Sequence, residues 1–184
     1  MSALKQCLPL TALCVMISFS SAVVADDLED TLHEVSFGVL DHDTDNLWSG
    51  FSRESGVDIN AEVLFNSVYD VLGGHIHPAV GASINTGGDT SKVYAGLRYR
   101  YELDNGLFFG LGLGVAAHDG ETKLVQADKK ALGSTLLFHI PAEVGYRFSE
   151  HYSASIYFDH ISNGYTQDEN EGLDTLGMRI GYRF

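Results

Sequence analysis

A histidine and a serine two positions apart, with an aspartate twelve residues further on, are the residues of this sequence best suited to catalysis. They are His160, Ser162 and Asp174. A serine hydroxyl is a poor nucleophile until a neighbouring imidazole takes its proton, and the imidazole works best when a carboxylate holds its tautomer and stabilises its charge. These three residue types therefore predict nucleophilic catalysis, provided that the fold brings them together.

The same residues also have a purely structural interpretation. His160 and Ser162 can form the polar rim where a strand leaves a membrane, and Asp174 can be an ordinary acid at the end of a loop. A His-x-Ser pair is common in proteins, so the spacing alone favours the structural interpretation. The position of the three residues on the fold must decide between the two.

The residues around His160 and Asp174 predict two neighbouring strands. Every second residue from 152 to 158 is apolar, and His160 and Ser162 continue that row, because successive side chains of a strand alternate between faces. The alternation at 176–184 has a parity that places Asp174 on the apolar face as well. If these strands are antiparallel neighbours, Asp174 lies beside His160.

Alternation of this kind recurs along most of the chain and predicts eight strands. Their approximate positions are 34–40, 57–63, 76–84, 95–101, 109–115, 138–146, 152–158 and 176–184. One face of these segments is polar or glycine and the other is bulky and apolar, which is typical of a transmembrane barrel with a lipid-facing exterior. The even strand number and the aromatic last residue, Phe184, also favour this fold. The sequence therefore predicts an all-β protein, an eight-stranded antiparallel transmembrane β-barrel of the bacterial outer membrane.

The expected barrel has a filled interior and two different ends. Eight strands enclose a lumen that side chains can fill, which disfavours a transporter or ligand-binding barrel. Six charged residues are expected to neutralise one another there, namely Asp58, Glu62, Arg98, Arg100, Glu143 and Arg147. Short turns are predicted at 104–106 and 149–151, and longer outward loops near 41–56, 85–92, 117–134 and 163–173.

Residues 1–25 have the order of a secretory signal peptide. A lone positive charge precedes an apolar stretch at 8–17, and small residues lead to Ala25. The apolar stretch is shorter than the roughly 20 residues of a membrane-spanning helix, so we expect it to be cleaved. A single barrel domain at 26–184 would remain. Both cysteines lie in the leader, so no disulfide is expected in the mature chain.

The charge balance limits the kinds of partner that the chain could bind. The sequence has 11 basic and 25 acidic residues and a formal net charge of −14. Such acidity argues against nucleic acid as a partner. It fits solvated loops, and a divalent cation that bridges loop acids to anionic lipid is the alternative.

Two segments resemble metal sites only in part. His75 and His77 fall on one face of a strand, but the sequence shows no third ligand for them. The segment Asp41-His42-Asp43-Thr44-Asp45 lacks the glycine and the distal glutamate of a calcium loop. The sequence therefore predicts neither a metal nor another cofactor.

The C-terminal residues resemble a known family. The stretch His160-Ile161-Ser162-Asn163-Gly164, followed by Asn170-Glu171-Gly172-Leu173-Asp174 and a closing strand, is similar to the signature of the PagL family of lipid A 3-O-deacylases. The segment at 35–41 also resembles the family's first strand, whereas the middle of the chain matches only in pattern and length. The resemblance implies an outer-membrane enzyme with lipopolysaccharide as substrate, which removes the ester-linked acyl chain at the 3 position of lipid A.

The resemblance also implies a role for individual residues. Ser162 would be the nucleophile, His160 the general base and Asp174 the orienting acid, while Asn163 and Asn170 would be candidate donors to the oxyanion, with Asn170 the better one. The family pattern has glutamate where this chain has Asp174, one methylene shorter. Glu171 is the nearby substitute, although its parity puts it on the opposite face of the strand.

A rival interpretation has a different consequence. The chain could be a non-catalytic outer-membrane barrel with a role in envelope integrity or adhesion. An esterase requires Ser162 for its activity, whereas a non-catalytic barrel does not. The sequence leaves open whether two copies form a homodimer, and it does not indicate the preferred acyl chain length.

Overall fold

Nine antiparallel strands and their connections make up residues 30–184, the part of the chain that the computed structural model describes. The strands are β1 (Leu32–His42), β2 (Val57–Phe65), β3 (Tyr69–Val71), β4 (Gly74–Asn85), β5 (Lys92–Glu102), β6 (Leu107–His118), β7 (Leu136–Arg147), β8 (Tyr152–Ser162) and β9 (Leu173–Arg183). The signal peptide predicted at 1–25 lies outside the described residues. Within residues 30–184, no helix is long and apolar enough to cross a membrane.

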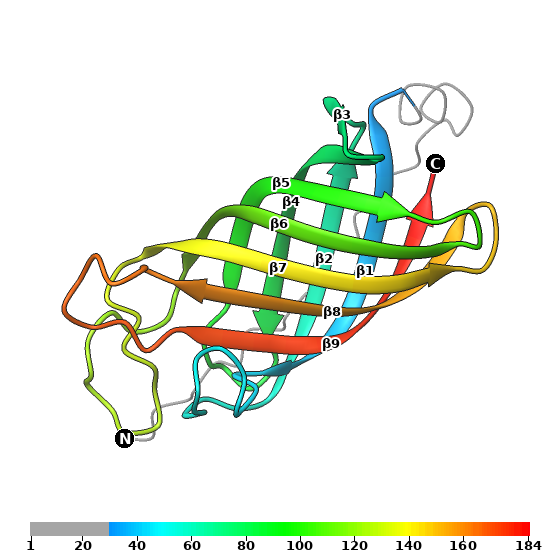
Figure 1. Ribbon diagram of the computed structural model, residues 1–184. Helices are drawn as coiled ribbons and strands as arrows, with labels where there is room; N and C mark the ends of the chain where they lie inside the picture. The colour runs from blue at the N-terminus through cyan, green and yellow to red at the C-terminus, as the bar shows by residue number, and fades with distance from the viewer. Residues whose placement is uncertain (1–29) are drawn as a thin grey trace, which may run out of the picture.

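Eight of these strands close into a barrel (Figure 1). Neighbours in sequence pair antiparallel from β4 to β9, β9 pairs with β1, β1 with β2, and β2 with β4. The eight-stranded barrel predicted from the alternation is thus confirmed. The ninth strand, β3, pairs only with the start of β4, beyond the last β2–β4 pair at Leu64 and Ala79. The sequence did not predict β3, because three residues are too few to show alternation.

The two faces of each strand differ as the alternation predicted. On β8, Ile156 is exposed on the outside and its neighbour Tyr157 is buried in the lumen. On β9, Met178 is exposed and Arg179 is buried. An exterior of exposed apolar side chains matches the hydrocarbon of a bilayer.

Buried ion pairs fill the lumen. Glu62 accepts hydrogen bonds from Arg98 and from Arg179, the latter at 3.0 Å. A buried charge needs a partner of opposite sign, because removal from water is costly. The remaining members of this group are Glu34, Arg100 and Glu143.

The membership of the lumen network differs from the prediction at four residues. Asp58 pairs instead with His42 at 2.8 Å, near the loop end of the barrel, and Arg147 pairs with Glu102 at the other end. Glu34 and Arg179 join the network although the sequence analysis did not include them. The register between distant strands decides which charges meet, and alternation alone does not contain it.

The two ends of the barrel carry different connections, as Figure 1 shows. One end has the four longer loops, at 43–56, 86–91, 119–135 and 163–172. The opposite end has the short turns, the β3 hairpin and the C terminus. The four loops agree with the predicted outward segments, and they lie at the end of the barrel where β8 ends and β9 begins.

Candidate active site

Two neighbouring strands, β8 and β9, bring the predicted catalytic residues together on the outer wall. In the β8–β9 ladder, His160 lies directly opposite Asp174, and in the β7–β8 ladder Phe138 lies opposite Ser162. Even-numbered side chains of β8 and β9 face outward, as the exposed Ile156 on β8 and Met178 on β9 show. His160, Ser162 and Asp174 therefore lie on the outward face that the alternation predicted.

Two short hydrogen bonds link the three side chains. His160 Nδ1 is 2.6 Å from Asp174 Oδ1, and His160 Nε2 is 2.9 Å from Ser162 Oγ. With the Nδ1 proton donated to the carboxylate, Nε2 accepts the hydrogen bond from the serine hydroxyl. This is the arrangement that a histidine needs to take a proton from serine.

His160, Ser162 and Asp174, the candidate triad, face outward but are shielded from their surroundings. Asp174 is 0 % exposed, His160 5 % and Ser162 9 %. Part of the cover is the loop at 43–56, where the Ser49 backbone N–H donates to Asp174 Oδ2 at 2.6 Å and the Trp48 ring stacks on the imidazole. Trp48 and Ser49 could not be found from the sequence, because a loop residue has no periodicity that reveals its neighbours.

A cavity of 260 Å³ opens beside the serine and the histidine. Its lining combines the triad hydroxyl and imidazole with apolar outward side chains of β7 and with residues of two loops. These residues are Trp48, Ser49, Phe138, Ile140, His160, Ser162, Gly164, Tyr165, Asn170, Glu171 and Gly172. The cavity thus has a polar reactive side and an apolar side that continues the lipid-facing wall.

The two asparagines take different positions. Asn163 Nδ2 donates to the backbone carbonyls of Leu132 at 3.0 Å and of Glu169 at 2.5 Å, so its amide holds the loops together and does not serve the cavity. Asn170 lines the cavity, and its Oδ1 accepts the Asn163 backbone N–H at 2.9 Å. Because Oδ1 is fixed in this way, Nδ2 is the amide group of Asn170 that remains to donate.

Glu171, the alternative acid, is engaged elsewhere. Its Oε1 is 2.9 Å from Arg53, and its Oε2 accepts the Ala131 backbone N–H at 2.7 Å. The carboxylate therefore joins three loops to one another. Of the two acids considered from the sequence, Asp174 is the one that lies against His160.

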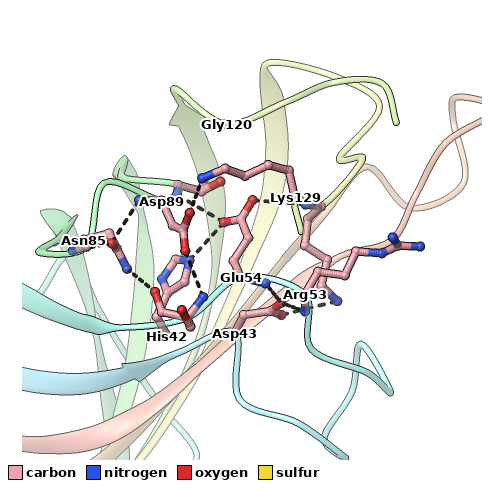
Figure 2. A network of polar contacts seen from close by, with 12 residues as sticks. His42, Asp43, Arg53, Glu54, Asn85, Asp89, Gly120 and Lys129 are labelled. Atoms are coloured by element: carbon pink, nitrogen blue, oxygen red, sulfur yellow. Dashed lines mark hydrogen bonds and ion pairs between the residues drawn. The ribbon is translucent and has the colours of Figure 1, made fainter. Parts of the chain in front are cut away.

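The loops above the triad are held by a buried polar network, shown in Figure 2. Glu54 is its centre and accepts hydrogen bonds from His42 Nε2 at 3.0 Å and from the backbone N–H groups of Thr90 and Lys130. Burial raises the pKa of Glu54, but these hydrogen bonds outweigh burial and lower the pKa from 4.5 to about 2. Glu54 is therefore ionised at neutral pH and binds three loops together.

A second carboxylate completes the network. Asp43 Oδ2 accepts the backbone N–H groups of Arg53 at 2.7 Å and of Glu54 at 3.0 Å, and its Oδ1 is 3.3 Å from Lys130 Nζ. Burial raises the pKa of Asp43 and outweighs these bonds. The two ends of the loop at 43–56 are thereby tied to each other and to the loop at 119–135.

The two histidines of β4 have separate partners. His75 Nδ1 is 2.6 Å from Asp70 on the exposed β3 hairpin, and His77 Nδ1 is 2.9 Å from the Phe65 carbonyl oxygen. Across residues 30–184, no group of three His, Cys, Asp or Glu side chains is arranged to hold a metal ion. The segment at 41–45 contributes Asp43 to the loop network described above.

The fold and the site together define a class of protein. A closed barrel of eight strands with an apolar exterior and a filled, charged lumen is a small outer-membrane β-barrel. A family model described as lipid A 3-O-deacylase (PagL) matches residues 34–183, and the chain belongs to that family. Membership places it among the outer-membrane hydrolases that act on lipid A, which confirms the family and the location predicted from the sequence.

Solved structures agree with this fold. The outer-membrane enzyme PagL is 20% identical, with a TM-score of 0.62, over 82% of this chain and 99% of that one. The N-terminal barrel domain of Pseudomonas aeruginosa OprF is 12% identical, with a TM-score of 0.53, over 84% of this chain and 99% of that domain. A de novo designed transmembrane β-barrel is 14% identical, with a TM-score of 0.51, over 83% of this chain and 97% of the design. No curated protein matches the chain in sequence.

Proposed function

We propose that this protein hydrolyses the ester that links an acyl chain to the 3 position of lipid A, with Ser162 as nucleophile, His160 as general base and Asp174 as orienting carboxylate. The observation that carries the proposal is the pair of hydrogen bonds on the outer wall, in which His160 donates to Asp174 and the Ser162 hydroxyl donates to His160. A triad of this kind suits many esters. Membership of the deacylase family and a position facing lipid favour lipid A as the substrate.

The chemistry follows from the geometry of the three side chains. Ser162 Oγ attacks the ester carbonyl carbon while Nε2 of His160 takes the hydroxyl proton, and Asp174 stabilises the imidazolium. Collapse of the tetrahedral intermediate breaks the bond to the sugar oxygen, which receives the proton from Nε2. Water, activated by the same imidazole, then hydrolyses the acyl-serine. The products are a free fatty acid and a lipid A with a hydroxyl at the 3 position.

Asn170 is the side chain that we assign to the oxyanion. Its Nδ2 group is directed by the hydrogen bond between its Oδ1 and the Asn163 backbone, and the residue lines the cavity beside Ser162. A donor fixed before the reaction lowers the energy of the developing negative charge without reorganisation. Asn163 then acts through Asn170 and not on the substrate.

The apolar side of the cavity supports a route for the acyl chain. Phe138 and Ile140 face outward from β7 and lie opposite Ser162 and His160 in the ladder. An acyl chain placed against them continues directly along the lipid-facing wall of the barrel. The substrate can thus present its ester to Ser162 while most of its hydrocarbon stays in the bilayer.

The experiment is a deacylation assay with matched variants. The refolded barrel is incubated with lipopolysaccharide in detergent, and lipid A is followed by mass spectrometry for the wild type, Ser162→Ala, His160→Asn and Ser153→Ala. Ser153 is a buried serine on the lumen face of the same strand. The proposal is supported if the wild type and Ser153→Ala remove one 3-hydroxyacyl unit and the other two variants do not. Heat-modifiable migration of all four proteins shows that each barrel is folded. Unchanged lipid A from all four favours a non-catalytic barrel with an envelope role.

A further inference from the structure

The loop at 43–56 places two consecutive residues against the triad, although it is distant from β8 and β9 in the sequence. Its Ser49 backbone N–H donates to Asp174, and its Trp48 ring contacts His160. The family signature at 160–174 contains neither residue. The contribution of this loop to catalysis rests on the proposed function.

Ser49 completes the hydrogen bonding of the catalytic carboxylate. One oxygen of Asp174 bonds to the imidazole at 2.6 Å, and the other accepts the Ser49 N–H at 2.6 Å. Because each oxygen has its own donor, the carboxylate cannot rotate without losing one of them. Asp174 has a shorter side chain than glutamate, so a second fixed contact sets the position from which it reaches His160.

Trp48 covers the flat face of the imidazole. The two ring centroids are 4.5 Å apart and the ring planes differ by only 9°. The face of an indole attracts a cation, and tryptophan does so best among the aromatic side chains. The imidazole becomes a cation at the moment it takes the Ser162 proton, so this contact favours the charged form that the reaction needs.

The rest of the loop holds these two residues in place. Thr44 N–H donates to the Asp174 carbonyl at 2.9 Å, and Asp43 and Glu54 anchor the two ends of the loop in the network of Figure 2. Gly50 follows with a φ of 82°, a left-handed conformation that lets the chain turn away directly after Ser49. The loop is thus tied down on both sides of the contact with the triad.

A membrane anchor is the alternative role for Trp48. The residue is 61% exposed, and tryptophan is enriched where a membrane protein meets the lipid headgroups. An anchor does not require a parallel stack on one histidine, nor a neighbour that bonds to the acid of the same site. We propose that Trp48 and Ser49 are positioning residues of the active site, Ser49 through Asp174 and Trp48 through His160.

Fluorescence tests the Trp48 contact without any assay of activity. Trp48 is the only tryptophan of the chain, so the intrinsic emission reports on this residue alone. An imidazole in contact with indole quenches its emission, above all when protonated. His160→Asn is expected to increase the emission, whereas His151→Asn, which removes a ring stacked on Tyr182 at the opposite end, leaves it unchanged. Equal emission from the wild type and both variants overturns the contact.

Kinetics separates positioning from anchoring. Trp48→Leu is expected to lower kcat about tenfold with little change in KM, and Trp48→Phe, which keeps an aromatic face, is expected to restore most of it. If Trp48 only anchored the barrel in the membrane, its replacement would change KM or neither kinetic constant. Equal kcat for the Phe and Leu variants overturns the role of the ring.

Ser49 is tested by a pair of variants that separate its hydroxyl from its backbone N–H. Ser49→Ala keeps the N–H and is expected to keep kcat within about threefold, whereas Ser49→Pro removes the donor and is expected to lower kcat about a hundredfold. The emission of Trp48 and heat-modifiable migration show whether the proline variant keeps its loop and barrel. A fully active proline variant with native emission overturns the role of the N–H.

The two proposals fail in different ways. An inactive wild type overturns the proposed function, and the positioning role with it, whatever the emission shows. An active wild type whose Trp48 and Ser49 variants have unchanged kcat overturns the positioning role alone.

Discussion

A Cβ atom at position 172 would lie 3.0 Å from Cε1 of His160, so Gly172 is in direct contact with the edge of the imidazole. Gly172 also has a φ of 65°, in the left-handed region that favours glycine. A side chain is therefore opposed there both by the backbone conformation and by the ring. The residue fixes how closely the loop at 163–172 approaches the proposed general base.

Replacement of this glycine should damage catalysis more than folding. Gly172→Ala is expected to lower kcat by about tenfold or more, because the new methyl group pushes the imidazole off its line to Ser162. Gly88→Ala is the matched control, since Gly88 has a φ of 87° and nothing within 4 Å of its added Cβ. Deacylation rates and heat-modifiable migration are measured for both. Equal losses in the two variants would assign the effect to backbone strain alone.

The identity of the triad acid predicts a graded series. Asp174→Asn is expected to lower kcat about a thousandfold, because an amide does not stabilise the imidazolium. Asp174→Glu adds a methylene between the β9 backbone and the carboxylate, which shifts the carboxylate relative to His160 and the Ser49 N–H, so we expect an intermediate loss. Glu171→Gln is expected to leave most of the activity, because Glu171 bonds to Arg53 and Ala131. A Glu171 variant as inactive as Asp174→Asn would contradict this assignment.

The two asparagines are expected to respond differently. Asn170→Ala should lower kcat about a hundredfold, as the loss of an oxyanion donor does, and should lower the melting temperature less than Asn163→Ala, because it removes only the acceptor of the Asn163 N–H. Asn163→Ala should lower the melting temperature in detergent, because its amide bonds to Leu132 and Glu169 in two loops. Thermal unfolding of both variants, followed by circular dichroism, accompanies the assay. A normal rate for Asn170→Ala would remove this residue from the oxyanion site.

The face that carries the candidate catalytic residues could be predicted from the sequence because it depends on parity. Strand alternation is exact, so one count places His160, Ser162 and Asp174 on the same outward row. The hairpin between β8 and β9 adds the register, because the two strands are adjacent in the chain. Strand alternation and the adjacency of β8 and β9 in the chain were therefore enough to place these three side chains.

The cover of the site could not be predicted in the same way. Trp48 and Ser49 reach the triad only after the barrel closes between β1 and β9 and after Asp43 and Glu54 fold the loop back. The contacts of Trp48 with His160 and of Ser49 with Asp174 join residues more than a hundred positions apart. The ion pairs of Glu34 and Arg179 were missed for the same reason, since each depends on a register across the lumen.

The low pKa of Glu54 predicts how the loops respond to acid. Its folded value of about 2 lies below the ordinary 4.5, so its contribution to stability is fully present above about pH 4.5 and is lost as the pH falls towards 2. The backbone N–H groups of Thr90 and Lys130 donate to Glu54. After correction for the intrinsic pH dependence of exchange, their protection from hydrogen exchange should therefore increase from pH 2 to pH 4.5. Glu54→Gln should lose this response, and a wild type without it would contradict the network.

Covalent labelling of Ser162 tests the central claim most directly. A fluorophosphonate with an alkyl chain reacts with serines that a neighbouring imidazole activates, and peptide mass spectrometry locates the adduct. We expect one adduct, on Ser162, in the wild type, and none in His160→Asn. An adduct on another serine, or continued deacylation of lipid A by Ser162→Ala, would contradict it.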